Sequence, residues 1–520
     1  MYRSHHFLSL FAITLLSLAI YANSLQNGFV YDDGDTIVNN ILIKDLSNLS
    51  SLFGKEYFSL SGETSYRPVV TLTYFIDYAL YGVGPWGYHL TNVLIHATNG
   101  LLLYIFMTLL IGHSEAKTYA KAPQSRPVSQ FLNLPLIISL LFVTQPVLTE
   151  AVNAVSFRED LLASLFYIST LILYLITRSG TSRKPGFLSL AVYIFSCITY
   201  SLALFSKEMS LTLVAIVFCL EWLNRKDNGR ARIVNWQIIG YTGITCGYIF
   251  VRFYYFLSPI SEELPAWSFP ERLQTIPWLL MNYIKLCLFP ISLSTDYVVV
   301  PVKSAYSPLF IIPLIAIISL AGAALITKKA GRMPAFGGIF FFVSLTPVCN
   351  IVRITNPFAE RYAYLPAIGL VIVTGWAIHH LLLSEEQNCT LRRLVLPTLA
   401  FFLIIGLYSM IAIERNAVWK DSYSLWSDTV RKMPNSSRAH YNCGFFYSQQ
   451  GNIDKAIREY NVALKLKPDH HKAAQNLALL YFDNGLYSEA SKVYEEILIM
   501  FPNDRFARGM QDEVLKKIAK

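Results

Sequence analysis

Charged residues are scarce in this chain. Lys, Arg, Asp and Glu make up 15% of its 520 residues, whereas a soluble globular domain carries about 25%. The deficit extends over the first four fifths of the chain, so much of that surface needs a solvent other than water. The basic residues behind the net charge of +9 lie in short loops between apolar runs. That pattern indicates membrane topology, and we expect no nucleic-acid partner.

Cysteine is also sparse, and its spacing matches no metal-binding motif. Five of the seven cysteines lie in or beside apolar segments, where a thiol acts as a small hydrophobic group: Cys197, Cys219, Cys246, Cys287 and Cys349. We therefore expect neither a disulfide framework nor a zinc site. No cofactor is predicted, and a requirement for a divalent cation is left open.

Long apolar runs are abundant. A membrane-crossing helix needs about 17 to 25 predominantly apolar residues, and runs of about this length occur throughout the first four fifths of the chain: 7–23, 89–112, 132–149, 160–177, 187–205, 208–223, 236–256, 307–327, 335–352, 363–383 and 394–413. The first run lacks a small-residue cleavage site, so it is predicted to be the first span and not a signal peptide. The pattern predicts an all-α, polytopic membrane helix bundle.

The basic loops predict the orientation of that bundle. Clusters of Lys and Arg follow alternate runs, at 117–126, 178–184, 225–232, 328–332 and 392–393. If all of them are cytoplasmic, as the positive-inside rule requires, the chain has about eleven spans. The N-terminus is then cytoplasmic and the C-terminal tail external. This model makes 275–291 re-entrant or interfacial; a twelve-span model would reverse everything after residue 290.

The tail has the composition of a soluble helical domain. Pro434, Pro468 and Pro502 recur every 34 residues, the length of a tetratricopeptide repeat. The small and aromatic residues with which paired helices of that repeat pack occur twice in register: Gly444, Tyr447, Gly451, Ala456, Tyr460 and Ala463, then Ala478, Tyr481, Gly485, Ala490, Tyr494 and Ile497. An arbitrary pair of amphipathic hairpins is the alternative.

These patterns predict two domains. A membrane domain covers 1–414, with an external loop at 24–87 and an external or re-entrant segment at 257–306. An external repeat domain covers 415–520. Its predicted parts are a half unit, two repeats and a capping helix: 419–436, 437–470, 471–504 and 505–518.

Four compact charged motifs fall on the face predicted to be external: Tyr31-Asp32-Asp33-Gly34-Asp35, Phe157-Arg158-Glu159-Asp160, Ser206-Lys207-Glu208 and Ala359-Glu360-Arg361-Tyr362. Ionisable groups at membrane depth cost about 2.5 to 3.5 kcal/mol each and tend to face a cavity or a partner. The mixture of acids and bases indicates a site for an anionic head group, with carboxylates available for proton transfer. Structural ion pairs at helix ends explain the last three motifs equally well. Adjacent Asp32 and Asp33 repel one another and have no nearby partner in sequence; a helix cap or simple solvation is the alternative for them.

His89, Asn92 and His96 share one face of a predicted helix. A metal site is conceivable there, but the two histidines have no clear carboxylate partner. We expect them to form hydrogen bonds between helices.

Taken in order, these motifs resemble the transmembrane and tetratricopeptide-repeat O-mannosyltransferases, a family within the GT-C glycosyltransferase superfamily. The resemblance covers nearly the whole chain. It rests on the four charged motifs, the repeats and four further segments: Tyr66-Arg67-Pro68, the run from His89 to His96, Leu286 to Tyr297, and Ala359 to Pro366. The departure is the tail, because members of the family usually carry a longer repeat array.

The resemblance implies an enzyme that takes a monosaccharide, such as mannose, from a polyprenyl-phosphate donor. It implies an external active site and transfer with inversion to Ser or Thr hydroxyls of a polypeptide held in the repeat groove. The implied base is Asp32 or Asp33, and the implied phosphate-binding cations are Arg361, Arg158 and Lys207. The supporting residues are Glu159, Asp160, Glu208, Glu360, His89 and His96.

Other functions remain open at this stage. A GT-C enzyme acting on a lipid or glycan would share the membrane motifs, and a non-enzymatic membrane scaffold would need only the repeats. A transporter would place its charges near the bilayer midplane, not at helix ends. The sugar, the acceptor and the oligomeric state are not determined. The short repeat array favours a bacterial inner membrane over the endoplasmic reticulum.

Overall fold

The computed structural model describes residues 2–519, apart from 55, 62, 64, 115–131, 179–185, 224–234, 256–266, 327–331 and 384–390. All regular elements in these residues are helical, which confirms the predicted fold class. The chain divides into two compact units. One comprises Met1–Leu293 with Pro301–Ala417, and the other comprises Ser294–Val300 with Val418–Lys520.

Within the described residues, six helices are long and apolar enough to cross a membrane: His5–Gln26, Pro85–Gly112, Val155–Arg178, Phe187–Ser206, Glu360–Leu382 and Val395–Val418. A seventh span results if Leu134–Val143 and Pro146–Asn153, which are bent by 49°, form one crossing. The runs predicted at 208–223, 236–256, 307–327 and 335–352 contain the shorter helices α11 (Leu213–Leu223), α12 (Trp236–Phe250), α14 (Pro308–Ile326) and α15 (Arg332–Leu345). The chain is thus a multi-pass membrane protein, and the count of eleven stays a prediction.

Most basic loops that predict the topology lie outside the described residues, including 117–126, 225–232 and the lysines at 328 and 329. The beginning of the predicted external segment 257–306 lies outside them as well. The described part of that segment contains α13 (Phe269–Leu288). This helix begins with a capping box, in which Ser268 and Glu271 satisfy each other's backbone N–H groups.

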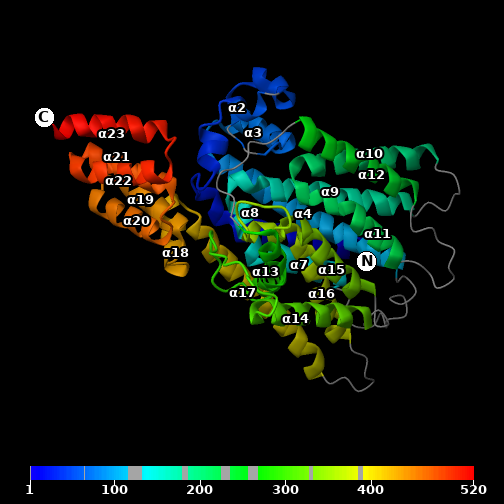
Figure 1. Cartoon of the computed structure of the whole chain (residues 1–520). Coiled ribbons are helices and arrows are strands. Elements are labelled where there is room, and N and C mark those ends of the chain that lie inside the picture. Colours follow the sequence, from blue (N-terminus) through cyan, green and yellow to red (C-terminus); the bar gives the residue numbers. More distant parts are fainter. Residues whose placement is uncertain are drawn as a thin grey trace. The chain divides into compact units, whose positions relative to one another are not determined.

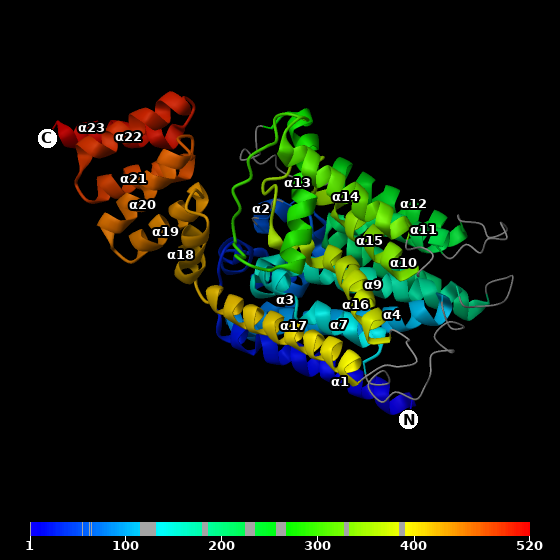
Figure 2. The ribbon, with the colours of Figure 1, turned by 90° about the horizontal axis from the view of Figure 1, so that it is seen from below.

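Long helices pack side by side at the centre of the membrane unit (Figures 1 and 2). α4 (Pro85–Ser114) contacts α1 (Tyr2–Tyr21), α7 (Leu134–Val143) and α9 (Arg158–Arg178), and α9 packs along α10 (Phe187–Ser206). α15 and α16 (Tyr364–Leu383) approach closely at Gly337 and Gly369, where a Cβ on Gly369 would lie 2.4 Å from the Gly337 carbonyl oxygen. Small residues at such a crossing let helix backbones touch without a hydrophobic driving force between them.

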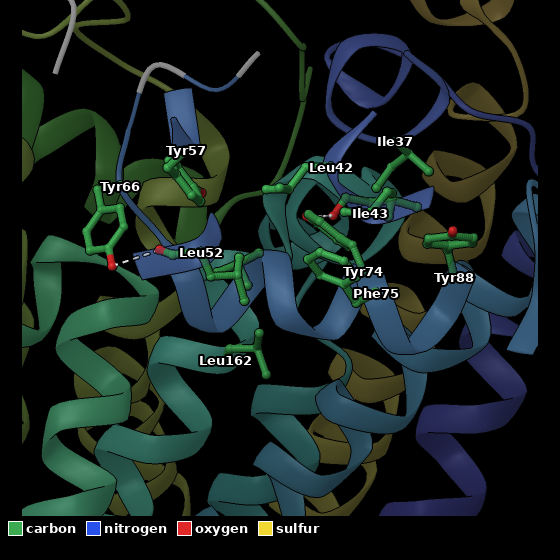
Figure 3. Close-up of a cluster of buried hydrophobic side chains, with 12 residues drawn as sticks. Ile37, Leu42, Ile43, Leu52, Tyr57, Tyr66, Tyr74, Phe75, Tyr88 and Leu162 are labelled. Atoms are coloured by element: carbon green, nitrogen blue, oxygen red, sulfur yellow. Dashed lines mark hydrogen bonds between the residues drawn. The ribbon is translucent and has the colours of Figure 1, made fainter. Parts of the chain in front are cut away.

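The predicted external loop folds into a layer of short helices with its own core. It contains η2 (Gly34–Val38), η3 (Leu42–Lys44), η4 (Leu46–Phe53), α2 (Tyr57–Ser61) and α3 (Pro68–Tyr81). Their buried aliphatic and aromatic side chains pack together with Tyr88 of α4 and Leu162 of α9 (Figure 3). Two tyrosines also donate hydrogen bonds to backbone carbonyls. Tyr66 Oη lies 3.0 Å from the Leu52 carbonyl oxygen, and Tyr74 Oη lies 2.8 Å from that of Val155. This core fixes the loop against the first turns of α9.

The second unit is a stack of helix pairs: α18 (Ser422–Lys432), α19 (Ser437–Gln449), α20 (Ile453–Leu466), α21 (His471–Asp483), α22 (Tyr487–Met500) and α23 (Arg505–Ile518). α23 covers the segment predicted as a capping helix. Gly444 of α19 lies against the ring of Tyr460 of α20, where a Cβ would come within 2.8 Å of the ring. Ser294–Val300 belongs to this unit, because Ser436 Oγ donates to Asp296 Oδ2 at 2.6 Å.

Candidate active site

Two of the four predicted charged motifs meet at Arg67. This arginine immediately precedes α3, and Pro68 at the first helical position keeps its backbone outside the helix. Arg67 Nη1 contacts Glu159 at the start of α9, and Arg67 Nη2 lies 3.2 Å from Glu208 Oε2 in η7 (Glu208–Thr212). One cation from the external loop therefore joins two elements of the helix bundle.

Lys207 connects the same two elements by a second route. Its Nζ atom lies 2.6 Å from Asp160 Oδ2 and 3.1 Å from Glu159 Oε1, and its side chain is only 4% exposed. Glu208 in turn has a second cation, since its Oε1 lies 3.9 Å from Arg252 Nη2. Glu159 and Asp160 lie in the first turn of α9, where the helix dipole favours negative charge.

Arg361 forms a second ion pair beside this network. Its Nη1 atom donates to Glu150 Oε1 at 2.6 Å, and its backbone N–H donates to Oε2 of the same residue at 2.9 Å. Glu150 is fully buried in α8 (Thr149–Asn153). The Arg361 guanidinium lies 4.9 Å from the Tyr362 ring centroid, and Lys207 Nζ lies 5.3 Å from the same centroid. The shared ring places the two cationic centres next to each other.

The structure separates the two adjacent aspartates, which the sequence left equivalent. Asp33 is fully buried, and its two carboxylate oxygens accept the backbone N–H groups of Ser156 at 2.7 Å and Val30 at 3.1 Å. Burial raises the pKa of Asp33 to about 6. Asp32, in contrast, is exposed. Asp33 therefore anchors the loop, and Asp32 is the carboxylate that a substrate can reach.

The loop that carries Asp32 leads directly to the Arg361 pair. Tyr31 adopts a φ of 58°, in the left-handed region that non-glycine residues rarely occupy. Its ring packs edge-on against Phe157 at a centroid distance of 5.3 Å. The Arg361 guanidinium lies 4.1 Å from the centroid of that same Phe157 ring. Asp32 therefore directly follows Tyr31, whose ring contacts Phe157, and Phe157 in turn contacts the Arg361 guanidinium.

Arg158 does not join the other predicted cations. It is fully buried and has an ion pair with Asp77 at 2.6 Å. It also donates to Asn92 at 2.7 Å, to Thr73 at 3.0 Å and to the Tyr88 carbonyl at 3.1 Å. These contacts tie α9 to α3 and α4. The geometry favours a role in positioning the first turn of α9 over contact with a donor.

The remaining predicted residues lie in buried polar contacts. Glu360 is fully buried, with Arg415 Nη2 3.8 Å from its Oε2. His96 hydrogen-bonds Tyr364 Oη at 2.7 Å and lies 3.3 Å from the Val143 carbonyl, so it connects three helices. His89 lies 3.4 Å from the Gly28 carbonyl. The prediction of hydrogen bonds between helices is confirmed for His96. Within the described part of the chain, no group of three His, Cys, Asp or Glu side chains is placed to hold a metal ion.

Four residues that form ion pairs in the charged centres were not predicted from the sequence: Arg67, Asp77, Glu150 and Arg252. Glu150 could have been found, because it is a lone acid directly after an apolar run, and an ionisable residue at that depth indicates a buried partner. Arg67 was part of a recognised motif but had no assigned role. Nothing in the local sequence distinguishes Asp77 or Arg252.

The comparisons with known proteins agree with this organisation. The tail matches the family model described as Tetratricopeptide repeat over residues 448–511. The chain is 24% identical to Protein O-mannosyl-transferase Tmtc3 of Drosophila melanogaster over 95% of its length. It is 26% identical to Protein O-mannosyl-transferase F38B6.6 of Caenorhabditis elegans, and 26% identical to Protein O-mannosyl-transferase TMTC1 of Homo sapiens, each over 90% of its length.

The chain spans 59%, 64% and 56% of these three relatives, respectively, which is less than two thirds of each. The similarity nevertheless extends through the membrane unit and into the repeats, in the order that the motifs predicted. The resemblance inferred from the sequence is therefore confirmed: this chain is related along most of its length to the transmembrane and tetratricopeptide-repeat O-mannosyltransferases.

Proposed function

We propose that this chain is a membrane glycosyltransferase that moves a monosaccharide, in the first instance mannose, from a polyprenyl-phosphate donor to Ser or Thr hydroxyls of proteins. The observation that carries the proposal is the convergence of Arg67, Lys207 and Arg361 at one end of the bundle. The exposed Asp32 directly follows Tyr31, whose ring packs on the Phe157 ring that the Arg361 guanidinium also contacts. The names of the relatives support the sugar and the protein acceptor.

Asp32 is the proposed general base. A hydroxyl is a poor nucleophile near neutral pH and gains from a carboxylate that removes its proton. In the proposed step, the acceptor oxygen attacks the anomeric carbon while the bond from that carbon to the phosphate oxygen breaks. The proton passes to Asp32, and the phosphate leaves with the bonding electrons. A single displacement of this kind inverts the anomeric centre.

The cations stabilise the leaving phosphate. Negative charge grows on the phosphate oxygens as the bond breaks, and positive groups already fixed in place lower the barrier without reorganisation. Arg361 and Lys207 are held by Glu150, Asp160 and Glu159, so their positions are set before the donor arrives. Glu208 and Glu360 support them as further carboxylates of the same region, and Arg158 positions the first turn of α9.

The donor chain would lie between the membrane helices, and the extended acceptor would lie in the groove of the repeat unit. We propose that the site faces away from the cytoplasm, in a bacterial inner membrane or in the endoplasmic reticulum. A divalent cation, if one is needed, would enter with the phosphate.

The deciding experiment is transfer of radiolabelled mannose from polyprenyl-phosphate mannose by the purified chain, with Asp32→Asn compared with Asp35→Asn. Asp35 is a matched control, because it is an exposed aspartate in the same loop. We expect transfer to disappear only in Asp32→Asn. A wild type that transfers to a lipid or glycan but not to protein would indicate a different GT-C acceptor. A function that survives Asp32→Asn but requires the repeat groove would indicate a scaffold.

A further inference from the structure

The cations of the site differ in how their carboxylate partners are shared. Every cation here is paired, so a phosphate can be bound only if a cation exchanges a carboxylate for it. Such an exchange is costly when it leaves a buried carboxylate without any counter-charge. A cation can therefore bind an incoming anion when its carboxylate partners keep another cation.

Arg361 and Lys207 fail this condition. Glu150 is fully buried, and Arg361 is its sole cationic partner among the described residues. Lys207 is likewise the sole ion-pair partner of Asp160 within 4 Å among the described residues. Releasing either pair would leave an uncompensated carboxylate in the protein interior. The same holds for Arg158 and its partner Asp77.

Arg67 meets the condition at both of its contacts. If it leaves Glu159, that carboxylate keeps Lys207 at 3.1 Å. If it leaves Glu208, that carboxylate keeps Arg252 at 3.9 Å. In both cases the released carboxylate keeps a counter-charge. Arg252 also meets the condition, because Glu208 keeps Arg67, but the Arg252 side chain is only 10% exposed.

The surroundings of Arg67 also favour the exchange of a carboxylate for a phosphate. The Arg67 side chain is 21% exposed, compared with 7% for Arg361 and 4% for Lys207. Its buried Nε atom has no hydrogen-bond partner in the described residues. A guanidinium presents its N–H groups as a planar fork that matches two phosphate oxygens, so Nε together with one Nη can take such a pair.

We infer that Arg67 binds the phosphate of a polyprenyl-phosphate ligand directly, by exchanging its carboxylate contacts for phosphate oxygens. Glu159 and Glu208 are then held by Lys207 and Arg252. This inference rests on the proposed function for the class of ligand. It assigns Arg361 and Lys207 a fixed positive field, and Arg67 the phosphate contact.

The test measures binding of a sugar-free polyprenyl phosphate to the full chain in lipid nanodiscs. We expect Arg67→Gln to weaken binding at least tenfold and Arg67→Lys, which keeps the charge but loses the fork, to weaken it less. We expect Glu208→Gln to tighten binding about threefold, because one competing carboxylate is removed. Arg178→Gln is the matched control and should not change binding, since Arg178 is 29% exposed and pairs with Glu221 at the other end of α9.

The double variant Arg67→Gln/Glu208→Gln separates direct competition from general electrostatics. If Glu208 acts by competing for Arg67, its removal gains nothing once Arg67 is absent. A gain of the same size in both backgrounds would overturn the inference, as would unchanged binding in Arg67→Gln. Should Arg67→Gln fail to fold, binding by Glu208→Gln that is no tighter than that of the wild type overturns it instead. A wild type that binds the lipid but transfers no sugar contradicts only the proposed function, and a wild type that binds no polyprenyl phosphate contradicts the inference.

Discussion

The two ends of α9 carry similar residues and differ in how these are connected. At the first turn, Glu159 and Asp160 share Lys207, and Glu159 also reaches Arg67. At the last turn, Arg178 pairs with Glu221 at 3.0 Å. Glu221 also accepts a hydrogen bond from Tyr174 Oη, which in turn accepts one from Asn235. Both ends satisfy the helix dipole, with acids first and a base last.

The comparison shows that buried charge alone does not identify a site. Among the described residues, the pair at the last turn consists of one cation, one carboxylate and a tyrosine that donates to the carboxylate. The network at the first turn has shared partners and a contact from Arg67, which precedes α3. Sharing allows partners to be exchanged, and exchange is what an incoming phosphate requires.

The largest expected effect tests whether the chemistry belongs to one end only. Asp32→Asn should lower sugar transfer by about 10² to 10⁴, the usual contribution of a general base, while Arg178→Gln should leave transfer near the wild-type rate. The measurement is the initial rate with saturating donor and acceptor. Equal losses in both variants would mean that the two ends do not differ in function.

The second prediction compares the stability of the two ends. Lys207→Met should reduce the free energy of unfolding by about 3 to 5 kcal/mol, because it removes the ion-pair partner of the buried Asp160. Arg178→Met should cost clearly less, since its side chain is 29% exposed and Glu221 keeps its tyrosine. Thermal unfolding in detergent at pH 7 checks this. A larger loss at Arg178 would reverse the ranking.

The third prediction concerns how the contribution of Asp33 to stability depends on pH. The pKa of Asp33 is raised from 3.8 to about 6, so the folded state binds this proton more tightly than the unfolded state. Its stabilising contribution is therefore fully present below about pH 4 and is lost as the pH rises through about 6. The shift corresponds to about 3 kcal/mol.

The measurement is the unfolding free energy of wild type minus that of Asp33→Asn, followed from pH 7 down to pH 4. The difference should move in favour of the wild type as the pH falls. A difference that does not change with pH would show that the fold does not raise the pKa of Asp33.

The smallest expected effect concerns stability at the last turn of α9. Tyr174→Phe removes the hydroxyl that bridges Glu221 and Asn235. The expected cost is about 1 kcal/mol, the net value of a typical hydrogen bond, with no change in transfer. Unfolding and transfer measured on the same preparation check both parts, and a loss of transfer would extend the site to this end.

Much of the architecture could be predicted because it follows from short-range patterns. Apolar runs bounded by polar residues gave α1, α4, α9, α10, α16 and α17 to within a few residues. The 34-residue period of proline predicted the helix pairs of the tail. The topology also predicted that the charged motifs lie at one end of the bundle. Two of these motifs share ion pairs in the network, and a third lies beside it across the Tyr362 ring.

The roles within the site were less predictable. Asp32 and Asp33 are neighbours with the same chemistry, and only the fold exposes one and gives the other two backbone N–H groups. Arg158 and Arg361 looked alike as cations beside acids. The first is enclosed by α3 and α4, whereas the second reaches Glu150, 211 positions away in sequence.

The sequence by itself therefore determined the helical class, the membrane character, the repeat tail and the motifs that carry charge. These depend on hydrophobic periodicity and on residue type, which act over one or two helical turns. Only the tertiary structure decided which charged groups share partners, which form single ion pairs and which carboxylate is exposed to solvent. A buried charge takes its energy from the groups around it, and in this chain those groups come from segments up to 211 residues apart.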